Sequence, residues 1–533
     1  MNVPPPSDPT LEAPPGHVSE RHVFESPHGD IAFPDAALTA VVLGRAKAMP
    51  DAVAMIDGAS GARHTFTELD DAIRRLAGGL AALGVGPGDR VALMAPNSPE
   101  FAIVFHAVAL RGAAVTTVNP TYGAEEIRFQ LEDAAAMLLV TVPPFLEAAR
   151  AAMKGTAVTE VLVIGESDGH RSIADVAGEP LEQEPVDAAE TIVALPYSSG
   201  TTGLPKGVML THRNLVANIA QTNAVLVNEP GEVALAVLPF FHIFGMQVLM
   251  NALLADGVTV VTLPRFDMGQ VLALIEKHRI NHLYCVPPIV LGLAKSPAVD
   301  EHELGSLKRV LSGAAPLGAE LAAEASARIG CTITQGYGMT EMSPVSHAIG
   351  SGPDRPGSSG QAVPGTRCRV VAENGRDVGA GEVGELLVQG PQVMKGYLGN
   401  PEASAATLDA EGWLHTGDVV TIDADGYLFV VDRVKELIKV KAFQVAPAEL
   451  EALLVTHPAV ADVAVIGVAD EEAGERPKAF VVVKPDASVA TEELRDFLAE
   501  RVASYKRVTD FTLVESIPKS PSGKILRRLL RDA

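Results

Sequence analysis

Apolar residues spaced three and four positions apart predict an amphipathic helix over residues 67–84. Thr67 is suited to cap its first turn together with Asp70, and Gly84 ends it. The apolar positions of this stretch are Leu69, Ile73, Leu76, Leu80 and Leu83. Because they share one face, we expect the helix to pack against other elements through that face.

Short apolar runs alternate with helical patterns through most of the chain. Residues 91–94 are predicted to form a buried strand, Asn97 or Ser98 to start the next helix, and residues 114–118 to form a strand after Gly112. Similar strands are predicted at 161–164, 258–263 and 310–312. This alternation indicates an α/β protein of layered parallel sheets covered by helices.

The pattern changes near residue 357. From there to residue 431, short β-rich runs are turned by Asn-Gly at 374–375 and Asp-Gly at 425–426, which predicts a β-barrel-like subdomain. After Asp432 a smaller α+β unit is predicted, with strands at 461–468, 479–483 and 511–514. A capped helix is predicted at 491–502, with Leu494 and Leu498 on one face.

Composition limits the classes of function. A chain of 533 residues is expected to contain at least two domains. Its 42 basic and 66 acidic residues give a formal charge of −24, which argues against nucleic acid or an anionic membrane as a partner. The three cysteines show no C-x-x-C spacing, so neither a disulfide framework nor a zinc site is indicated. A reducing, cytoplasmic location fits this cysteine usage.

Two segments bear on targeting. Residues 1–30 are proline-rich and lack the basic start and apolar run of a signal peptide, so a disordered leader is predicted. Residues 233–255 carry no charge, but polar residues and Pro239 interrupt them, so a buried strand, turn and helix is the better interpretation. No stable membrane insertion and no carrier domain in the chain are expected.

The segment YSSGTTGLPKG at residues 197–207 carries the strongest chemical signal. It combines four Ser and Thr hydroxyls, three glycines and Lys206. Small residues let the backbone approach an anion, while hydroxyls and the ammonium group donate to it. The spacing is not that of a P-loop, because Gly207 follows the lysine. A triphosphate site is predicted, although such a cluster alone is more often a flexible turn.

Four further segments accompany this loop: QGYGMTE (335–341), TGD (416–418), DRVKELIKVKAFQVAP (432–447) and SPSGKILRR (520–528). Their order and spacing are those of the adenylate-forming enzymes. From about Pro34 to Arg528 the chain resembles an acyl-CoA synthetase, most of all the 4-coumarate:CoA ligase group. The resemblance implies an N-terminal domain at 31–431, a hinge near Asp432 and a mobile lid at 432–533.

The resemblance also implies ATP, Mg²⁺, coenzyme A and a small carboxylic acid as ligands. Glu341 would bind the Mg²⁺ ion, Asp418 and Arg433 would contact the ribose, and Lys524 would bridge the attacking carboxylate and the α-phosphate. The other implied ATP-binding residues are Ser198, Ser199, Gly200, Thr201, Thr202, Gly203, Lys206, Arg265, Ala315, Gln335, Gly336, Tyr337, Gly338, Met339 and Thr340. The arginines after Lys524 are interpreted as a solvated basic face: Arg527, Arg528 and Arg531.

A second set of residues is implied for attack by the CoA thiol. His242 would lie between the acyl carboxylate and the thiol entrance, although a histidine in an apolar run is otherwise more often a core group. After rotation at Asp432 the lid would present Lys435, Lys439, Lys441, Ala442 and Gln444. Family members usually have glycine where this chain has Ala442, so a slower thioesterification is expected.

The acyl pocket is predicted to be apolar. Phe244 stands where hydroxycinnamate ligases commonly have tyrosine, and Val248, Gly313 and Val345 complete the lining. This lining favours cinnamate or a medium-chain acid over 4-coumarate, with a medium- or long-chain fatty acyl-CoA synthetase as the alternative. Residues 233–255 hold no carboxylate for an amino-acid substrate. A luciferase-like oxidation and a catalytically silent nucleotide-binding regulator stay open, the regulator being disfavoured by Lys524, Glu341 and Lys439.

Overall fold

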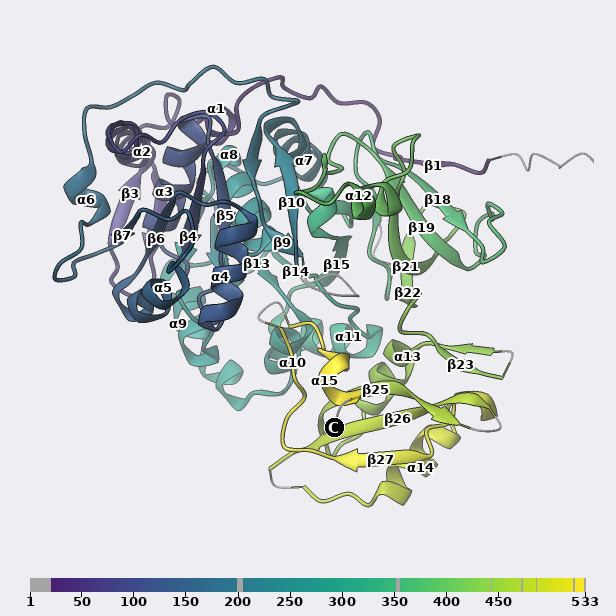
Figure 1. Cartoon of the computed structure of the whole chain (residues 1–533). Helices are drawn as coiled ribbons and strands as arrows, with labels where there is room; N and C mark the ends of the chain where they lie inside the picture. Colours follow the sequence, from purple (N-terminus) through teal and green to yellow (C-terminus); the bar gives the residue numbers. More distant parts are fainter. Residues whose placement is uncertain are drawn as a thin grey trace, which may run out of the picture.

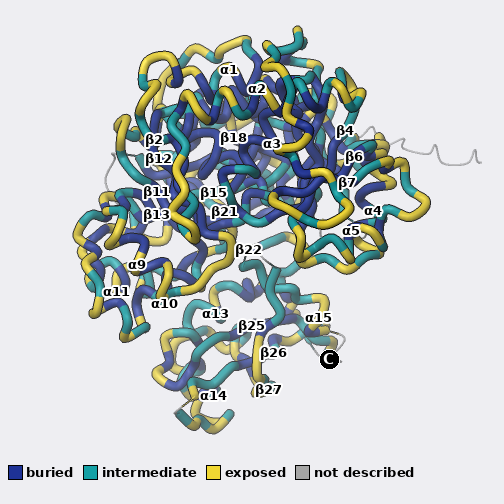
Figure 2. The backbone as a smooth tube through the Cα atoms, turned by 90° about the vertical axis from the view of Figure 1, so that its left-hand side faces the viewer, coloured by how far each residue is buried: buried dark blue, intermediate teal, exposed yellow. Residues whose placement is uncertain are grey.

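The computed structural model describes residues 21–198, 205–350, 355–441, 443–470, 473–485, 487–520 and 523–531. These residues form a large N-terminal α/β domain and a smaller C-terminal domain, as the sequence predicts (Figure 1). The chain passes from one to the other at the end of β22 (Leu428–Arg433), which lies at the junction in Figure 2.

Two sheets with parallel cores make up most of the N-terminal domain. One has the strand order β20 (Gly396–Tyr397), β10 (Lys206–Thr211), β8 (Ile192–Ala194), β5 (Ala114–Thr117), β4 (Arg90–Met94), β6 (Leu138–Thr141) and β7 (Glu160–Val163). The other has the order β17 (Gln361–Ala362), β16 (Val345–Ala348), β15 (Ile333–Gly338), β14 (Arg309–Ser312), β13 (His282–Cys285), β11 (Val233–Ala236), β12 (Thr259–Thr262), β2 (Val53–Asp57) and β3 (Arg63–Thr65).

Helices cover these sheets and fill the space between them. α3 (Pro99–Leu110) contacts β2 of one sheet and β4 and β5 of the other, so nearly every one of its residues is buried. α7 (His212–Val225) likewise contacts β10 and β16. The remaining helices of this domain are α1 (Leu38–Val42), α2 (Phe66–Ala82), α4 (Ala124–Asp133), α5 (Leu146–Ala152), α6 (Ile173–Val176), α8 (Leu253–Asp256), α9 (Met268–His278), α10 (Pro287–Lys295), α11 (Ala319–Ile329) and α12 (Pro401–Thr407).

Most predicted strands agree with the observed ones to within a residue or two, but the strand predicted at 479–483 begins five residues earlier, at Gly474. The helix predicted at 491–502 ends at Ala499 and has no side-chain cap, and the cap of α2 also differs. Thr65, not Thr67, is its N-cap: the Thr65 hydroxyl accepts from the Glu68 amide at 3.2 Å, and Glu68 Oε2 accepts from the Thr65 amide at 2.8 Å. For α3, the alternative Ser98 is confirmed as the cap. Asn97 instead bonds the 236–240 segment through its amide.

The segment considered as a membrane span is a buried strand, turn and helix, as interpreted from the sequence. It contains β11, the π-helix η2 (Phe244–Ala252) and α8. Among the residues that the structure describes, no helix is both long enough and apolar enough to cross a bilayer.

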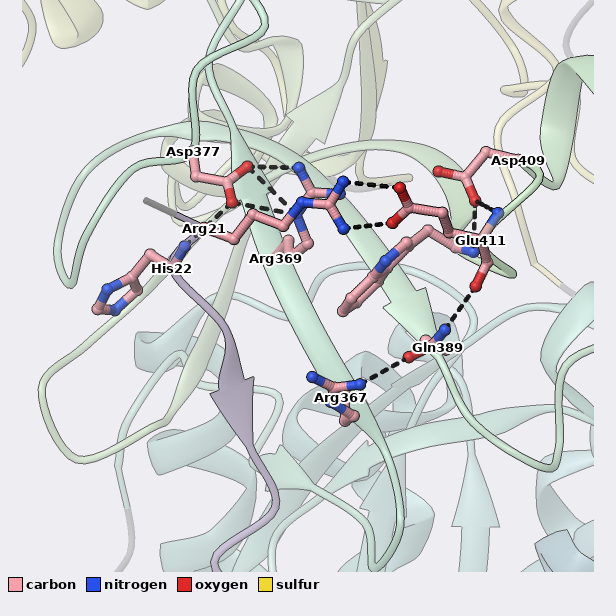
Figure 3. Close-up of polar contacts among 9 residues, drawn as sticks. Arg21, His22, Arg367, Arg369, Asp377, Gln389, Asp409 and Glu411 are labelled. Atoms are coloured by element: carbon pink, nitrogen blue, oxygen red, sulfur yellow. Dashed lines mark hydrogen bonds and ion pairs between the residues drawn. The ribbon is translucent and has the colours of Figure 1, made fainter. Parts of the chain in front are cut away.

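The predicted β-rich subdomain is an antiparallel sheet of order β1 (Phe24–Glu25), β18 (Arg367–Val371), β19 (Gly384–Gln389), β21 (Leu414–Ile422) and β22. Its edge strand β1 comes from the segment expected to be a disordered leader up to residue 30. Phe24 pairs with Cys368. Arg21 forms an ion pair with Glu411, and the His22 amide donates to Asp377 Oδ2 at 3.0 Å (Figure 3). Residues 21–25 are therefore docked on this sheet, because pairing with β18 satisfies their backbone.

The C-terminal domain is built on its own hydrophobic cores. Its sheet has the order β24 (Phe443–Val445), β23 (Ile438–Val440), β26 (Gly474–Val483) and β25 (Val460–Asp470), and β27 (Asp510–Leu513) pairs in parallel with β26. Its helices are α13 (Pro447–Leu454), α14 (Thr491–Ala499) and α15 (Arg527–Arg531). One core lies among residues 438–508 and another joins β25 and β26 to Ile517 and Leu530. The β-rich subdomain, in contrast, shares the core of the N-terminal domain.

Candidate active site

The two stems of the predicted phosphate loop pair with each other. β9 (Tyr197–Ser198) is antiparallel to β10, with Ser198 opposite Lys206. The Tyr197 hydroxyl donates to Asp133 Oδ2 at 2.6 Å, which ties this stem to the end of α4. The predicted residues between the stems lie outside the described residues: Ser199, Gly200, Thr201, Thr202 and Gly203.

Glu341 lies beside these stems. It is 5% exposed, and its Oε1 accepts hydrogen bonds from Ser198 Oγ at 2.8 Å and from the Tyr397 hydroxyl at 2.9 Å. Burial, reinforced by the Glu341 carboxylate, raises the pKa of Tyr397, so the phenol stays protonated and donates. The Lys206 ammonium lies 4.9 Å from the centroid of the Tyr397 ring, at cation–π distance.

The surroundings of Glu341 fit a divalent cation. No lysine, arginine or histidine of the described residues pairs with this buried carboxylate. No group of three or more His, Cys, Asp and Glu side chains that could hold a metal occurs in the described part of the chain. A single carboxylate suits Mg²⁺, which usually takes its other oxygens from phosphates and water.

The implied adenine side is formed by β15 and the turn before α11. Gln335 Oε1 accepts from the Leu317 amide at 2.8 Å, which joins β15 to the turn that contains the half-buried Ala315. Close packing favours glycine at positions 336 and 338, in addition to the nucleotide contact that the resemblance implies. A Cβ on Gly338 would lie 2.1 Å from the Pro344 carbonyl oxygen, and one on Gly336 would lie 3.3 Å from that of His347. Met339 and Thr340 follow as half-buried residues.

Asp418 is the centre of a buried polar group. Its Oδ2 accepts from the Tyr337 hydroxyl at 2.7 Å, and its Oδ1 lies 3.2 Å from Arg433 Nε. The three side chains come from β15, β21 and β22, and β-pairing sets Asp418 opposite Arg433. Burial raises the pKa of Asp418, and the Arg433 charge opposes this shift. The burial also raises the pKa of Tyr337, which therefore remains a donor.

Lys524, from the C-terminal domain, interacts with this group through its charge. Burial and the Arg433 charge lower its pKa to about 8, while Glu436 and Asp418 act in the opposite direction. Its neighbour Gly523 has φ +80°, and a Cβ there would lie 3.4 Å from Val286 at the start of α10. The 524 segment therefore packs against the N-terminal domain.

His242 lies within reach of the Lys524 charge. Burial, and to a smaller extent the Lys524 ammonium, lower its pKa to about 4. The Phe244 amide donates to its Nδ1 at 3.3 Å. At neutral pH the ring is thus uncharged, with one nitrogen engaged by the backbone.

The residues implied for CoA attack lie on another face of the C-terminal domain. β23 and β24 form a hairpin in which Lys439 pairs with Gln444, and both are exposed, as are Lys435 and Lys441. The hairpin is hydrogen-bonded within its own domain: the Lys439 amide donates to Glu475 Oε2 at 2.7 Å. Ala442 lies outside the described residues.

The predicted pocket residues are brought together in part. A Cβ on Gly313 would lie 2.8 Å from Phe244 Cε1, so the Phe244 ring lies directly against Gly313. Val248 follows Phe244 on η2 and is buried, and Val345 is half-buried with its carbonyl bonded by Asn218 at 2.7 Å. Arg265 is exposed and makes no hydrogen bond or ion pair with the described residues.

Comparison with known families agrees with this arrangement. The family model "AMP-binding enzyme" matches residues 44–398, and "AMP-binding enzyme C-terminal domain" matches residues 449–524. The chain belongs to the AMP-binding enzyme family.

Relatives of this AMP-binding enzyme align over nearly its whole length. It is 43% identical over 532 residues to 4-coumarate--CoA ligase 5 of Oryza sativa subsp. japonica, covering 97% of this chain and 98% of the relative. The anthranilate CoA ligase AuaEII in complex with anthranoyl-AMP superposes with a TM-score of 0.88 at 28% identity, covering 94% of this chain and 98% of that one.

A third relative was solved in two states. MatB from Rhodopseudomonas palustris, 31% identical and covering 94% of this chain and 99% of its own, gives a TM-score of 0.86 with ATP bound and 0.76 without it. This AMP-binding enzyme thus superposes better on the ATP-bound form of that protein.

Two residues of the site escaped the sequence analysis. Tyr397 occupies a two-residue strand without a local chemical pattern. Arg527, interpreted as solvated, is largely buried and forms ion pairs with Glu436 at 2.6 Å and Glu451 at 2.7 Å. Its partners lie 91 and 76 residues away in sequence, so no spacing could have revealed them.

Proposed function

We propose that this AMP-binding enzyme converts a cinnamate-like aryl acid into its CoA thioester. It is an AMP-forming acid–CoA ligase, which works in two half-reactions. The acid carboxylate first attacks the α-phosphorus of ATP, forming an acyl-adenylate and releasing pyrophosphate. The CoA thiol then attacks the acyl carbon, and AMP leaves with the electron pair of the broken bond.

In the first step the protein has to neutralise developing negative charge. Lys524, held near Asp418 and Arg433, supplies an ammonium group for the reacting carboxylate and α-phosphate. Ser198 and Lys206 would bind the terminal phosphates, and Glu341, which lies beside them, would hold Mg²⁺. The metal, when bound, neutralises phosphate charge and orients the leaving pyrophosphate. Asp418 orients the ribose, and Tyr337 borders the adenine.

In the second step the lid presents its other face. Rotation near Asp432 would bring Lys439, Lys441 and Gln444 to the adenylate in place of Lys524. His242 is neutral at pH 7, and because its Nδ1 accepts from the Phe244 amide, its Nε2 carries the proton and can donate a hydrogen bond to the acyl oxygen beside the carbon that the thiol attacks.

The observation that carries the substrate proposal is the Phe244 ring lying against Gly313. The ring gives an aryl acid an apolar face but no group to receive a phenolic hydroxyl. Burying an unpaired hydroxyl costs about 1–3 kcal/mol, so cinnamate should be preferred to 4-coumarate.

The test is a panel of cinnamate, 4-coumarate and octanoate with ATP and CoA, with AMP and acyl-CoA measured by chromatography. We expect acid-dependent release of both products and a higher kcat/KM for cinnamate. Phe244→Tyr should shift preference toward 4-coumarate by about fivefold or more. Phe266→Tyr, at an exposed phenylalanine, is the matched control. A tenfold preference of the unmodified enzyme for 4-coumarate would contradict the substrate proposal, and no acid-dependent AMP would contradict the activity.

A further inference from the structure

Tyr397 lies between Glu341 and Lys206, the two charged residues at the phosphate end of the site. Its backbone belongs to β20 and pairs with Val208 of β10. The Leu398 amide donates to the Gly207 carbonyl at 2.8 Å, and the Tyr397 amide donates to Ser404 Oγ at 2.8 Å. The residue is 7% exposed, so its side chain is held from both the sheet and α12.

The side chain then makes two contacts of different kinds. The hydroxyl donates to Glu341 Oε1 at 2.9 Å, and the face of the ring lies 4.9 Å from Lys206 Nζ. The same carboxylate oxygen accepts from Ser198 Oγ at 2.8 Å. Two donors on Oε1 restrict rotation of the carboxylate, and no described residue donates to Oε2.

We propose that Tyr397 is a positioning residue for both the metal-binding carboxylate and the phosphate-binding lysine. Its hydroxyl holds Glu341 so that Oε2 faces a bound Mg²⁺ ion, and its ring holds the Lys206 ammonium beside the phosphates. The inference rests on the proposed function, because it assumes that Mg·ATP binds between these groups.

The alternative is that Tyr397 is only a core residue, and the two contacts can be removed separately. Tyr397→Phe keeps the ring beside Lys206 but loses the bond to Glu341. Tyr397→Leu loses both. Titration calorimetry with ATP in EDTA and with ATP in excess Mg²⁺ gives the Kd for each form of the nucleotide without relying on turnover.

For Tyr397→Phe we expect the Kd for Mg·ATP to rise about tenfold, the loss of one hydrogen bond to a charged group, and the Kd for metal-free ATP to stay within twofold. Tyr397→Leu should weaken both, because Lys206 loses its aromatic partner. In a Glu341→Gln background, Tyr397→Phe should have no further effect on Mg·ATP affinity.

Tyr197→Phe is the matched control. This second tyrosine is on β9, which like β20 pairs with β10, but its hydroxyl bonds Asp133. Its loss should leave the ratio of the two Kd values unchanged. The inference would be overturned if Tyr397→Phe raised both Kd values equally, or if its effect and that of Glu341→Gln were fully additive. Acid-dependent acyl-CoA formation by the unmodified enzyme would still support the proposed function in that case. No Mg·ATP binding by the unmodified enzyme would overturn both.

Discussion

Two lysines of the C-terminal domain, Lys524 and Lys439, have opposite surroundings. Lys524 is half-buried, with its charge interacting with Asp418 and Arg433, and its neighbour Gly523 packs against α10. Lys439 is exposed on a hairpin whose backbone donates to Glu475 and Ala473 of the same domain. The structure therefore places the Lys524 segment, and not the Lys439 hairpin, against the N-terminal domain. This difference is the one that the proposed two-step mechanism requires, in which Lys524 acts in the first step and Lys439 in the second.

The segments that carry these two lysines also differ in how they are held. The 524 segment is followed by Arg527, whose guanidinium joins Glu436 and Glu451 and donates to the Val465 carbonyl at 3.1 Å. Burial raises the pKa of Glu451 to about 7 despite the Arg527 charge. The Lys439 hairpin has no comparable buried ion pair among the described residues. The 524 segment is therefore held more firmly than the Lys439 hairpin.

Arg527→Met should have the largest effect, because it removes the ion pairs that hold the 524 segment. Removing one partner leaves two buried carboxylates uncompensated, which costs about 3–5 kcal/mol. We expect the C-terminal domain to unfold at lower denaturant concentration and adenylation to fall with it. Arg528→Met, at the exposed neighbour, is the control. Equal behaviour of the two variants in urea unfolding would mean that the ion pairs do not hold the 524 segment.

Lys524→Ala should separate the two half-reactions. Adenylation, measured as acid-dependent ATP–pyrophosphate exchange, should fall about 10²- to 10³-fold, as when one preorganised charge stabiliser is lost. Attack of CoA on pre-formed acyl-adenylate should survive. Lys439→Ala is expected to do the reverse. If either variant slows both half-reactions equally, the assignment of one lysine to each conformation is wrong.

The pH dependence should mark Lys524 as the desolvated lysine. Its folded-state pKa, about 8, lies below the usual 10.5, so adenylation kcat/KM should fall about tenfold per unit as pH rises above 8. Between these values the unfolded chain binds more protons than the folded one. The buried Lys524 charge therefore lowers the free energy of unfolding by its full amount below pH 8, and this loss disappears as the pH rises to 10.5. In Lys524→Arg the alkaline limb should disappear, because arginine stays charged. Its persistence would assign the limb to another group.

The smallest expected effect is on the backbone. Gly523 and Gly474 both have φ +80°, and Gly474 lies beside Lys439, pairing with Val440. Alanine at either position costs about 1 kcal/mol of left-handed strain. Gly523→Ala should slow adenylation about fivefold and spare the CoA step, and Gly474→Ala should do the opposite. If the two substitutions affect both half-reactions identically, local backbone strain does not separate the role of the 524 segment from that of the Lys439 hairpin.

The sequence predicted what local pattern can encode. Buried strands such as β4 and β14, and the five motif segments, carry their own periodicity or spacing. The start of α2 was ambiguous because Thr65 and Thr67 each precede an acidic residue by three positions, and only packing decides between them. Gly338 belongs to a motif, but the close Pro344 carbonyl could not be foreseen.

Non-local contacts account for what the sequence did not reveal. Residues 21–25 look like a polar leader and are ordered by pairing with β18, more than 300 residues later. Arg527, Arg528 and Arg531 are chemically alike, and only distant carboxylates single out Arg527. Tyr397 gains its position through β10 and α12. In each case the partner lies too far along the chain for spacing to indicate it.

The docked N-terminal segment has an optical consequence. Trp413 is the sole tryptophan of the chain, is 3% exposed, and carries the guanidinium groups of Arg369 and Arg367 at 5.2 and 5.7 Å from its ring. It stands two positions from Glu411, the partner of Arg21. We therefore expect its intrinsic fluorescence to report on the β-rich subdomain and on the attachment of residues 21–25 to it.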